Sequence, residues 1–206
     1  MEYKVVFIDD NMKKGPNDPF VRAVHKLRPS AEVSVFEDPS VGLKYILENL
    51  NNKMIAFVDC RFDGYGLQGI NVLKQIREKT SLLYIVMMSA NNLKQIADID
   101  LAEMINQDYI WFFDRNNGTV NDACDLIDKI SSLWDSRFDC VLEQWLIRHQ
   151  EDNDKIAFTK DKTSYTWGEL LAEVRFQTEV GRDFERVMNQ YTIYQFKEKG
   201  ATIEKV

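Results

Sequence analysis

The feature that most constrains the fold is a series of short apolar runs that alternate with helically spaced segments over the first 115 residues. These runs are apolar on both faces, which is typical of strands buried in a parallel sheet. The expected strands are Tyr3–Ile8, Glu32–Phe36, Met54–Val58, Leu82–Met88 and Tyr109–Phe113. The expected helices are Pro19–Leu27, Val41–Leu50, Gly69–Lys79, Leu93–Leu101 and one from Val120 onward. The pattern predicts an α/β fold, a five-stranded doubly wound parallel sheet with helices on both faces.

The helical pattern continues beyond the last expected strand. No Gly or Pro occurs from Thr119 to Gln150, so we predict a single stalk-like helix about 40 Å long at 1.5 Å per residue. Two β-like runs near residues 156–165 then predict a small hairpin. Thr166 and Glu169 form a capping-box pattern that opens a last long helix, in which Gly181 is either a kink or a close packing contact. We therefore expect a domain over residues 1–132 and a mostly α-helical extension over 133–206.

Acidic residues stand at the ends of two expected strands. Asp9 and Asp10 end the first strand, and Asp59 ends the third. The first and third strands of such a sheet are neighbours, so the three carboxylates should converge at one edge. Clustered carboxylates raise one another's pKa unless a cation joins them, and Mg²⁺ is the hard, oxygen-preferring ion that suits them. One carboxylate could then attack a phosphoryl group and hold it as an acyl phosphate.

Four segments, in order, resemble the receiver domains of two-component response regulators, which have a flavodoxin-like fold. They are VVFIDDN, AFVDCRF, GLQGINVLKQIRE and YIVMMSAN. The resemblance covers about residues 1–132 and implies that Asp59 is the phosphoacceptor. It also implies a sensor histidine kinase or a phosphotransfer protein as the upstream partner.

The resemblance assigns further roles at the same edge. Asp9, Asp10 and Asp59 would bind Mg²⁺, and the backbone carbonyl of Arg61 would complete the metal shell. Ser89 would be the switch hydroxyl. Arg61 and Asn91 fall where members of the family tune the lifetime of the phosphoryl group.

Two departures from the family bear on this chemistry. The loop after Asp59, CRFDGYGLQG, is longer than in the family and lacks its Met-Pro pair. The family also places a lysine at the end of the fifth strand, where this chain has Asp114 and Arg115. If Arg115 faces Asp59, it supplies the missing cation. If Asp114 faces Asp59 instead, its negative charge disfavours an acyl phosphate.

Charge and composition narrow the partners and the compartment. The net charge is −7, and residues 136–206 carry 11 Lys and Arg against 13 Asp and Glu. A helix-turn-helix or winged-helix module would need a basic recognition face, so we expect no nucleic-acid partner. The chain has no apolar stretch of about 20 residues, no signal-peptide pattern and no C-x-x-C pair among its three cysteines. These features predict a cytoplasmic protein without a membrane partner.

The leading hypothesis is an atypical, non-enzymatic response regulator. Phosphorylation of Asp59 would be read out by the helical module through an unknown downstream protein, and we expect a homodimer. The alternative is a pseudo-receiver that dimerises or docks independently of phosphorylation, through helices over 120–148 and 166–198. A third hypothesis, metal-dependent phosphoester hydrolysis at the acidic cluster, has no identifiable general acid in the sequence.

Overall fold

The computed structural model describes residues 3–90 and 97–199. By its contacts the chain divides into two compact units, Met1–Ser136 and Arg137–Val206. In the described part of the chain, no helix combines the length and the apolar character that crossing a bilayer requires.

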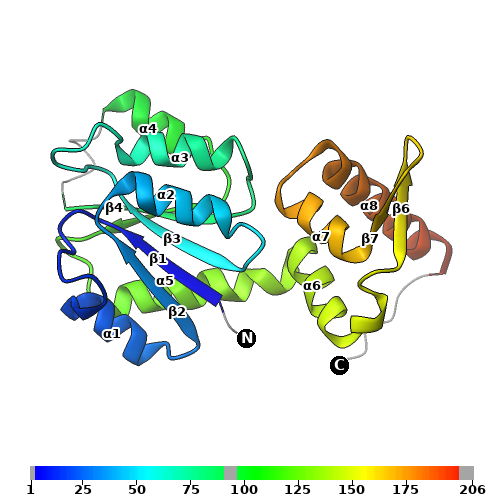
Figure 1. Cartoon of the computed structure of the whole chain (residues 1–206), viewed down its shortest axis with the longest axis horizontal. Helices are drawn as coiled ribbons and strands as arrows, with labels where there is room; N and C mark the ends of the chain where they lie inside the picture. The colour runs from blue at the N-terminus through cyan, green and yellow to red at the C-terminus, as the bar shows by residue number, and fades with distance from the viewer. Residues whose placement is uncertain (1–2, 91–96, 200–206) are drawn as a thin grey trace. The chain divides into compact units, whose positions relative to one another are not determined.

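The first unit is built on one five-stranded parallel sheet with strand order β2-β1-β3-β4-β5, which confirms the predicted fold class. Its strands are β1 (Tyr3–Ile8), β2 (Ala31–Phe36), β3 (Met54–Asp59), β4 (Tyr84–Ser89) and β5 (Ile110–Asp114). Its helices are α1 (Pro19–Leu27), α2 (Pro39–Glu48), α3 (Gly69–Arg77), α4 (Asp98–Ile105) and α5 (Val120–Leu133). Helices α2, α3 and α4 cover one face of the sheet, and α1 and α5 cover the other (Figure 1).

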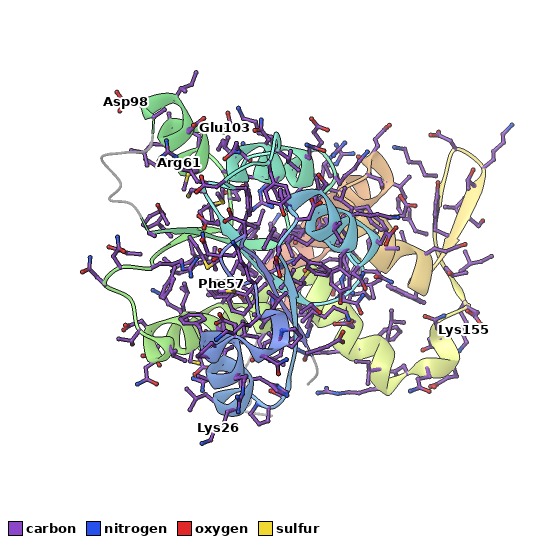
Figure 2. All side chains as sticks on the ribbon, turned by 60° about the vertical axis from the view of Figure 1, so that its left-hand side comes forward. Lys26, Phe57, Arg61, Asp98, Glu103 and Lys155 are labelled. Carbon is purple, nitrogen blue, oxygen red and sulfur yellow. The ribbon has the colours of Figure 1, made fainter. Side chains whose placement is uncertain are left out.

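The central strands are apolar on both faces because helices cover both. Every residue of β3 and β4 is buried. Phe57 of β3 is fully buried and stacks on Phe7 of β1, with ring centroids 4.8 Å apart. Figure 2 shows Phe57 inside this layered unit, whereas Lys26 of α1 lies at its outer side. The strand order reverses between β1 and β3, and such switch points are where ligands bind in open α/β sheets.

The predicted stalk helix is wrong. Helix α5 ends at Leu133, a 3-10 turn follows at Trp134–Ser136, and a separate helix, α6 (Phe138–Arg148), begins after Arg137. Arg137 has extended backbone angles, φ −84° and ψ 137°. Trp134 is buried edge-to-face against Tyr3, with ring centroids 5.3 Å apart. The continuous apolar spacing therefore marks the buried residues of two separate helices, α5 and α6, and not those of one long helix. The predicted start of the fourth helix, Leu93, lies outside the described residues.

The second unit consists of α6, a hairpin and two further helices. Strands β6 (Ile156–Lys160) and β7 (Thr163–Thr166) pair antiparallel. Asp161 and Lys162 join them with φ values of 50° and 70°, as a type I′ turn requires. The helices are α7 (Trp167–Arg175) and α8 (Glu179–Lys199). Phe184 of α8 is the centre of the core and contacts the rings of Phe138, Phe158 and Trp167.

The sequence predicted α7 and α8 as one long helix, which is also wrong. The predicted capping box is present: Thr166 Oγ1 accepts from the Glu169 amide, and the Thr166 amide donates to Glu169 Oε2. The break comes at Gln177, which adopts a positive φ of 51°. Gly181 lies inside α8 as a close packing contact, because a Cβ there would stand 2.2 Å from the Glu173 carbonyl oxygen of α7.

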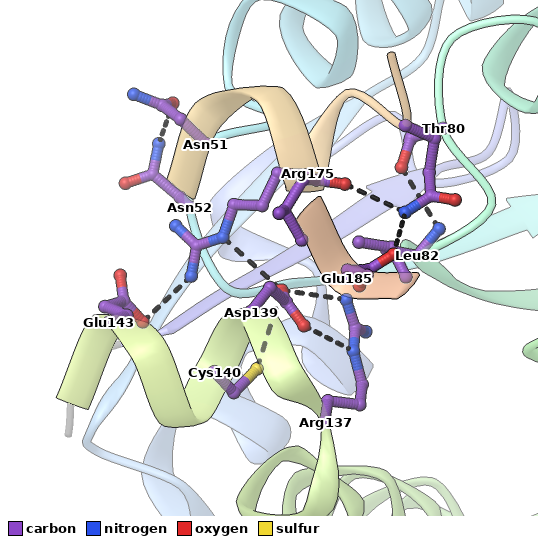
Figure 3. Close-up of polar contacts among 12 residues, drawn as sticks. Asn51, Asn52, Thr80, Leu82, Arg137, Asp139, Cys140, Glu143, Arg175 and Glu185 are labelled. Carbon is purple, nitrogen blue, oxygen red and sulfur yellow. Dashed lines mark hydrogen bonds and ion pairs between the residues drawn. The ribbon is translucent and has the colours of Figure 1, made fainter. Parts of the chain in front are cut away.

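Buried ion pairs join α6 to α7 within the second unit (Figure 3). Asp139 accepts hydrogen bonds from Arg137 Nε and Nη2, both at 3.0 Å, and from Arg175 Nε at 3.4 Å. Arg175 Nη2 also lies 2.9 Å from Glu143 Oε2. Two carboxylates thus face two guanidiniums in this cluster.

Candidate functional site

Three carboxylates meet at the carboxyl edge of the central strands. Asp9 follows β1 and Asp59 ends β3, and these strands pair in register from Lys4 with Met54 to Ile8 with Val58. Asp9, Asp10 and Asp59 offer oxygens that all lie within 4.8 Å of one another. Their exposed fractions are 0%, 9% and 5%. The neighbouring positions of β1 and β3 therefore produce a compact and buried acidic cluster.

Arg115 brings a positive charge to this cluster. Its Nη1 atom forms an ion pair with Asp9 Oδ2 and lies 3.7 Å from Asp59 Oδ2. Asp114 is engaged elsewhere, because its carboxylate accepts from the Asn116 amide at 2.9 Å and from Asn117 Nδ2 at 2.8 Å. Of the two alternatives left open by the sequence, the structure has Arg115 at the acidic cluster and Asp114 in its own loop.

Backbone amides donate hydrogen bonds to all three carboxylates of the cluster. Asp9 Oδ1 accepts from the Asn11 amide at 2.8 Å, and Asp59 Oδ1 accepts from the Arg61 amide at 3.2 Å. Asp10 Oδ2 accepts from the Asp63 amide at 2.8 Å. These donors hold the carboxylate oxygens in fixed positions, which is what a preorganised binding site needs.

The charge of the cluster is only partly compensated. Burial, followed by the charge of Asp9, raises the pKa of Asp59 to about 6, although the Arg61 amide and Arg115 act in the opposite direction. Burial also raises the pKa of Asp9, against the lowering effect of Arg115. Three carboxylates and one guanidinium leave an excess of negative charge in a buried place. This donor set fits a hard divalent cation such as Mg²⁺.

The long loop after Asp59 is held by the side chain of Gln68, a residue that no sequence pattern marks. Gln68 Oε1 accepts from the Phe62 amide at 3.0 Å, while Gln68 Nε2 donates to the carbonyl oxygens of Phe62 and Tyr65 at 3.0 and 2.8 Å. The loop in turn presents the Asp63 amide to Asp10. Nothing in the spacing of the sequence indicates these bonds, since they depend on how the loop folds back.

Gly69 allows helix α3 to begin directly against Asp59. A Cβ atom at Gly69 would lie 2.1 Å from the Asp59 carbonyl oxygen and 2.9 Å from Cys60 Cα. Only a residue without a side chain permits this approach. The glycine that opens the third predicted helix is therefore a packing requirement of the acidic site.

The other predicted site residues lie around this cluster. Ser89 ends β4, is 3% exposed and is paired in register with Asp114. The side chain of Arg61 is exposed, and its amide reaches Asp59 (Figure 2). The roles of the Ser89 hydroxyl and the Arg61 carbonyl stay predictions. Asn91 lies outside the described residues.

A second residue that the sequence did not indicate connects two loops beside the site. Asn116 Nδ2 donates to the carbonyl oxygen of Ala90, and the Arg115 amide donates to the Ser89 carbonyl oxygen at 2.8 Å. The segments that follow β4 and β5 are thereby joined.

The comparisons with known proteins bear on the fold. No protein-family model matches the chain, and no curated protein matches it. The N-terminal domain of an uncharacterized protein from Wolinella succinogenes is 14% identical, with a TM-score of 0.51 over 64% of this chain and 95% of that one. The isolated REC domain of RcsB from Salmonella enterica serovar Typhimurium, solved with phosphomimetic BeF3−, is 20% identical, with a TM-score of 0.48 over 64% and 90% of the two chains.

A response regulator receiver domain protein from Clostridium thermocellum is 18% identical, with a TM-score of 0.47 over 62% of this chain and 92% of that one. Similarities at these identities concern the fold alone. The strand order β2-β1-β3-β4-β5, with helices on both faces, agrees with the fold expected from the four sequence segments. This strand order is that of the flavodoxin-like doubly wound folds, so the first unit of this chain has the predicted α/β fold.

Proposed function

We propose that the first unit is the phosphoacceptor domain of an atypical response regulator and that Asp59 takes the phosphoryl group. The observation that carries this proposal is the buried Asp59 carboxylate, which has two further carboxylates beside it and the Arg115 guanidinium 3.7 Å from its Oδ2 atom. The receiver fold supports it. An upstream sensor histidine kinase or phosphotransfer protein would supply the phosphoryl group.

The two carboxylate oxygens of Asp59 have different contacts, which supports different roles for them in phosphoryl transfer. Its Oδ1 atom is held by the Arg61 amide, and its Oδ2 atom faces Arg115. In this proposal Oδ2 attacks phosphorus and forms the new O–P bond with its electron pair. The bond from phosphorus to the donor breaks, and the donor keeps that electron pair. Because burial raises the pKa of Asp59 to about 6, this carboxylate is ionised and nucleophilic above that pH.

The neighbouring residues would stabilise the product. Asp9, Asp10 and Asp59 would hold Mg²⁺, with the Arg61 carbonyl as a further ligand. The bound ion would supply positive charge to the phosphoryl oxygens. Arg115 is close enough to pair with a phosphoryl oxygen after leaving Asp9, and Ser89 would donate its hydroxyl to another.

Contact with another protein is the readout that the second unit supports best. The helices α7 and α8 are joined by a short turn at Phe176–Thr178, and a DNA-binding helix-turn-helix module also consists of two helices joined by a short turn. The charge of α8 argues against such a module. Val187–Phe196 of α8 contains no charged residue that could neutralise a phosphate of DNA. We therefore propose a cytoplasmic, non-enzymatic signalling protein with a downstream protein partner.

Intact-mass measurement tests the phosphoacceptor. The full chain is incubated with acetyl phosphate and Mg²⁺, and we expect the addition of one phosphoryl group. Asp59→Asn should abolish it, while Asp63→Asn, an exposed carboxylate in the same loop, should retain it. An unmodified wild-type protein, or a phosphoryl group that survives Asp59→Asn, would overturn the proposal.

The pseudo-receiver remains a second candidate because of one contact. Arg115 already pairs with Asp9, and this pairing reduces the excess negative charge without any added cation. In that case the unit would act as a dimerisation or docking module independently of phosphate. Partner binding and assembly state that are the same in wild type, Asp59→Asn and Asp59→Glu would favour this alternative.

A further inference from the structure

The side chain of Gln68 fixes a turn in the loop that follows Asp59. Its carboxamide accepts from the Phe62 amide at 3.0 Å and donates to the carbonyl oxygens of Phe62 and Tyr65 at 3.0 and 2.8 Å. The oxygen and both N–H bonds of the carboxamide are thus engaged by the backbone of the turn. A glutamate of the same shape would place a carboxylate against two carbonyl oxygens, so the turn selects an amide at this position.

The turn that Gln68 fixes delivers one backbone amide to the acidic cluster. Phe62 anchors the turn in the apolar core, where it is 2% exposed. Gly64 has a φ of 80°, in the left-handed region that favours glycine, and lets the chain reverse. Between these two residues, Asp63 exposes its side chain and donates its amide to Asp10 Oδ2 at 2.8 Å. The position of this amide therefore depends on the bonds that Gln68 makes.

The three carboxylates of the cluster depend on the turn to different degrees. Asp9 and Asp59 each accept from the backbone amide two residues further along the chain, at 2.8 and 3.2 Å. Asp10 accepts instead from the Asp63 amide, 53 residues away in the sequence. Its other oxygen accepts from Nδ2 of the exposed Asn11 at 3.0 Å. Local turns hold Asp9 and Asp59, whereas the orientation of Asp10 depends on the loop.

We propose that Gln68 is a positioning residue of the phosphoacceptor site. By fixing the turn, it holds the Asp10 carboxylate in the cluster, where the oxygens of Asp9, Asp10 and Asp59 lie within 4.8 Å of one another. Residues that orient metal ligands through hydrogen bonds account for about 10- to 100-fold in metal affinity. The inference rests on the proposed function, because it requires that these carboxylates bind Mg²⁺, and it gives a role to a residue to which the receiver resemblance assigns none.

Calorimetric titration of the full chain with Mg²⁺ tests this role. Gln68→Glu keeps the size of the side chain and an acceptor oxygen but loses both donated hydrogen bonds. Charge and position predict opposite results, because a carboxylate added near the cluster would by itself attract a cation more strongly. We expect Gln68→Glu to bind Mg²⁺ about tenfold more weakly than wild type. Gln75→Glu is the matched control, since it adds the same charge at an exposed position of α3, about two turns away, and should bind as wild type does.

The Asp63 amide provides a spectroscopic readout in the metal-free protein. Its proton resonance should move upfield in Gln68→Glu and in the uncharged Gln68→Met, because the hydrogen bond to Asp10 is weakened. The amide of Asn11, which belongs to a local turn, should keep its wild-type position. An unmoved Asp63 resonance in both folded variants would overturn the proposal.

The remaining outcomes separate this inference from the proposed function. Mg²⁺ binding by Gln68→Glu and Gln68→Met that equals or exceeds that of wild type would refute the positioning role, and so would a wild type that binds no Mg²⁺. If wild type binds Mg²⁺ and both variants bind it about tenfold more weakly, the role of Gln68 is supported. This holds even if wild type takes no phosphoryl group from acetyl phosphate, a result that would refute the phosphoacceptor proposal alone.

Discussion

The two units bury charged side chains in opposite ways. In the first unit, Asp9, Asp10 and Asp59 face one guanidinium, and burial, followed by the charge of Asp9, raises the pKa of Asp59 to about 6. In the second unit, Asp139 and Glu143 face Arg137 and Arg175, and every one of these charges has an opposite partner (Figure 3).

This difference in charge balance distinguishes a candidate binding site from an ion-pair cluster that stabilises the fold. Matched buried charges that connect two helices stabilise one arrangement of the chain, and removing one partner leaves the other uncompensated. Unmatched buried carboxylates cost stability and persist where a ligand or a reaction uses them. The acidic cluster of the first unit and the ion-pair cluster of the second should therefore respond in opposite directions when an acid is neutralised.

The largest effect is expected in the matched cluster. Asp139→Ala leaves the Arg137 and Arg175 guanidiniums buried without their shared carboxylate, and should lower the free energy of unfolding of the second unit by about 3–5 kcal/mol. Chemical denaturation followed by tryptophan fluorescence measures this loss. Glu143→Gln is the control, because Glu143 is 24% exposed and should cost about 1 kcal/mol or less. Equal losses for the two variants would contradict a structural role for Asp139.

The next effect concerns the packing of the acidic site. Gly69→Ala places a Cβ against the Asp59 carbonyl oxygen and must displace α3 or β3. We expect a loss of about 2–3 kcal/mol in the free energy of unfolding of the first unit, together with a loss of phosphorylation. Gly66→Ala is the matched control, since nothing lies within 4 Å of a Cβ there. If Gly69→Ala behaves like Gly66→Ala, the close approach is not a constraint.

Neutralising the unmatched cluster should stabilise the protein. The pKa of Asp59 in the folded state, about 6, lies above the ordinary value of 3.8. The folded state therefore binds this proton more tightly than the unfolded state does. The resulting contribution to the free energy of unfolding is fully present below pH 3.8 and is lost as the pH rises through 6. Asp59→Asn removes this loss and should gain about 2 kcal/mol at pH 7.5 in EDTA, and close to nothing near pH 3.5. Chemical denaturation at both pH values measures this gain. A destabilised Asp59→Asn at pH 7.5 would refute the claim that the carboxylates of the first unit are poorly compensated.

The smallest effect concerns the one cation of the cluster. Arg115→Gln removes a positive charge beside Asp9 and Asp59 and should strengthen Mg²⁺ binding about fivefold, or about 1 kcal/mol. Calorimetric titration with Mg²⁺ measures this change. Arg61→Gln alters an exposed side chain and should leave the affinity close to wild type. Weaker Mg²⁺ binding by Arg115→Gln would show that Arg115 organises the carboxylates for the ion.

Much of the first unit could be predicted from the sequence because its central strands, β1, β3 and β4, are buried on both faces. Apolar runs of this kind have few other places in a soluble fold, and β1 was predicted with its observed bounds, Tyr3–Ile8. The helix joints could not be predicted in this way. The spacing of apolar residues shows which residues are buried. When two consecutive helices each bury one face, this spacing continues from one helix to the next, and it therefore does not show where the first helix ends. The bends at Arg137 and Gln177 need neither Gly nor Pro, so no local signal marks them.

The sheet and the convergence of Asp9, Asp10 and Asp59 follow from the sequence alone, because residues at the ends of neighbouring parallel strands must meet at one edge. The choice between Asp114 and Arg115 depends on the folded chain, since adjacent residues just after a strand can each turn toward the site or away from it. The contacts by which Gln68 holds the loop and Asp139 joins α6 to α7 depend on the folded chain as well. Such contacts depend on distances across the fold, which no spacing along the chain records.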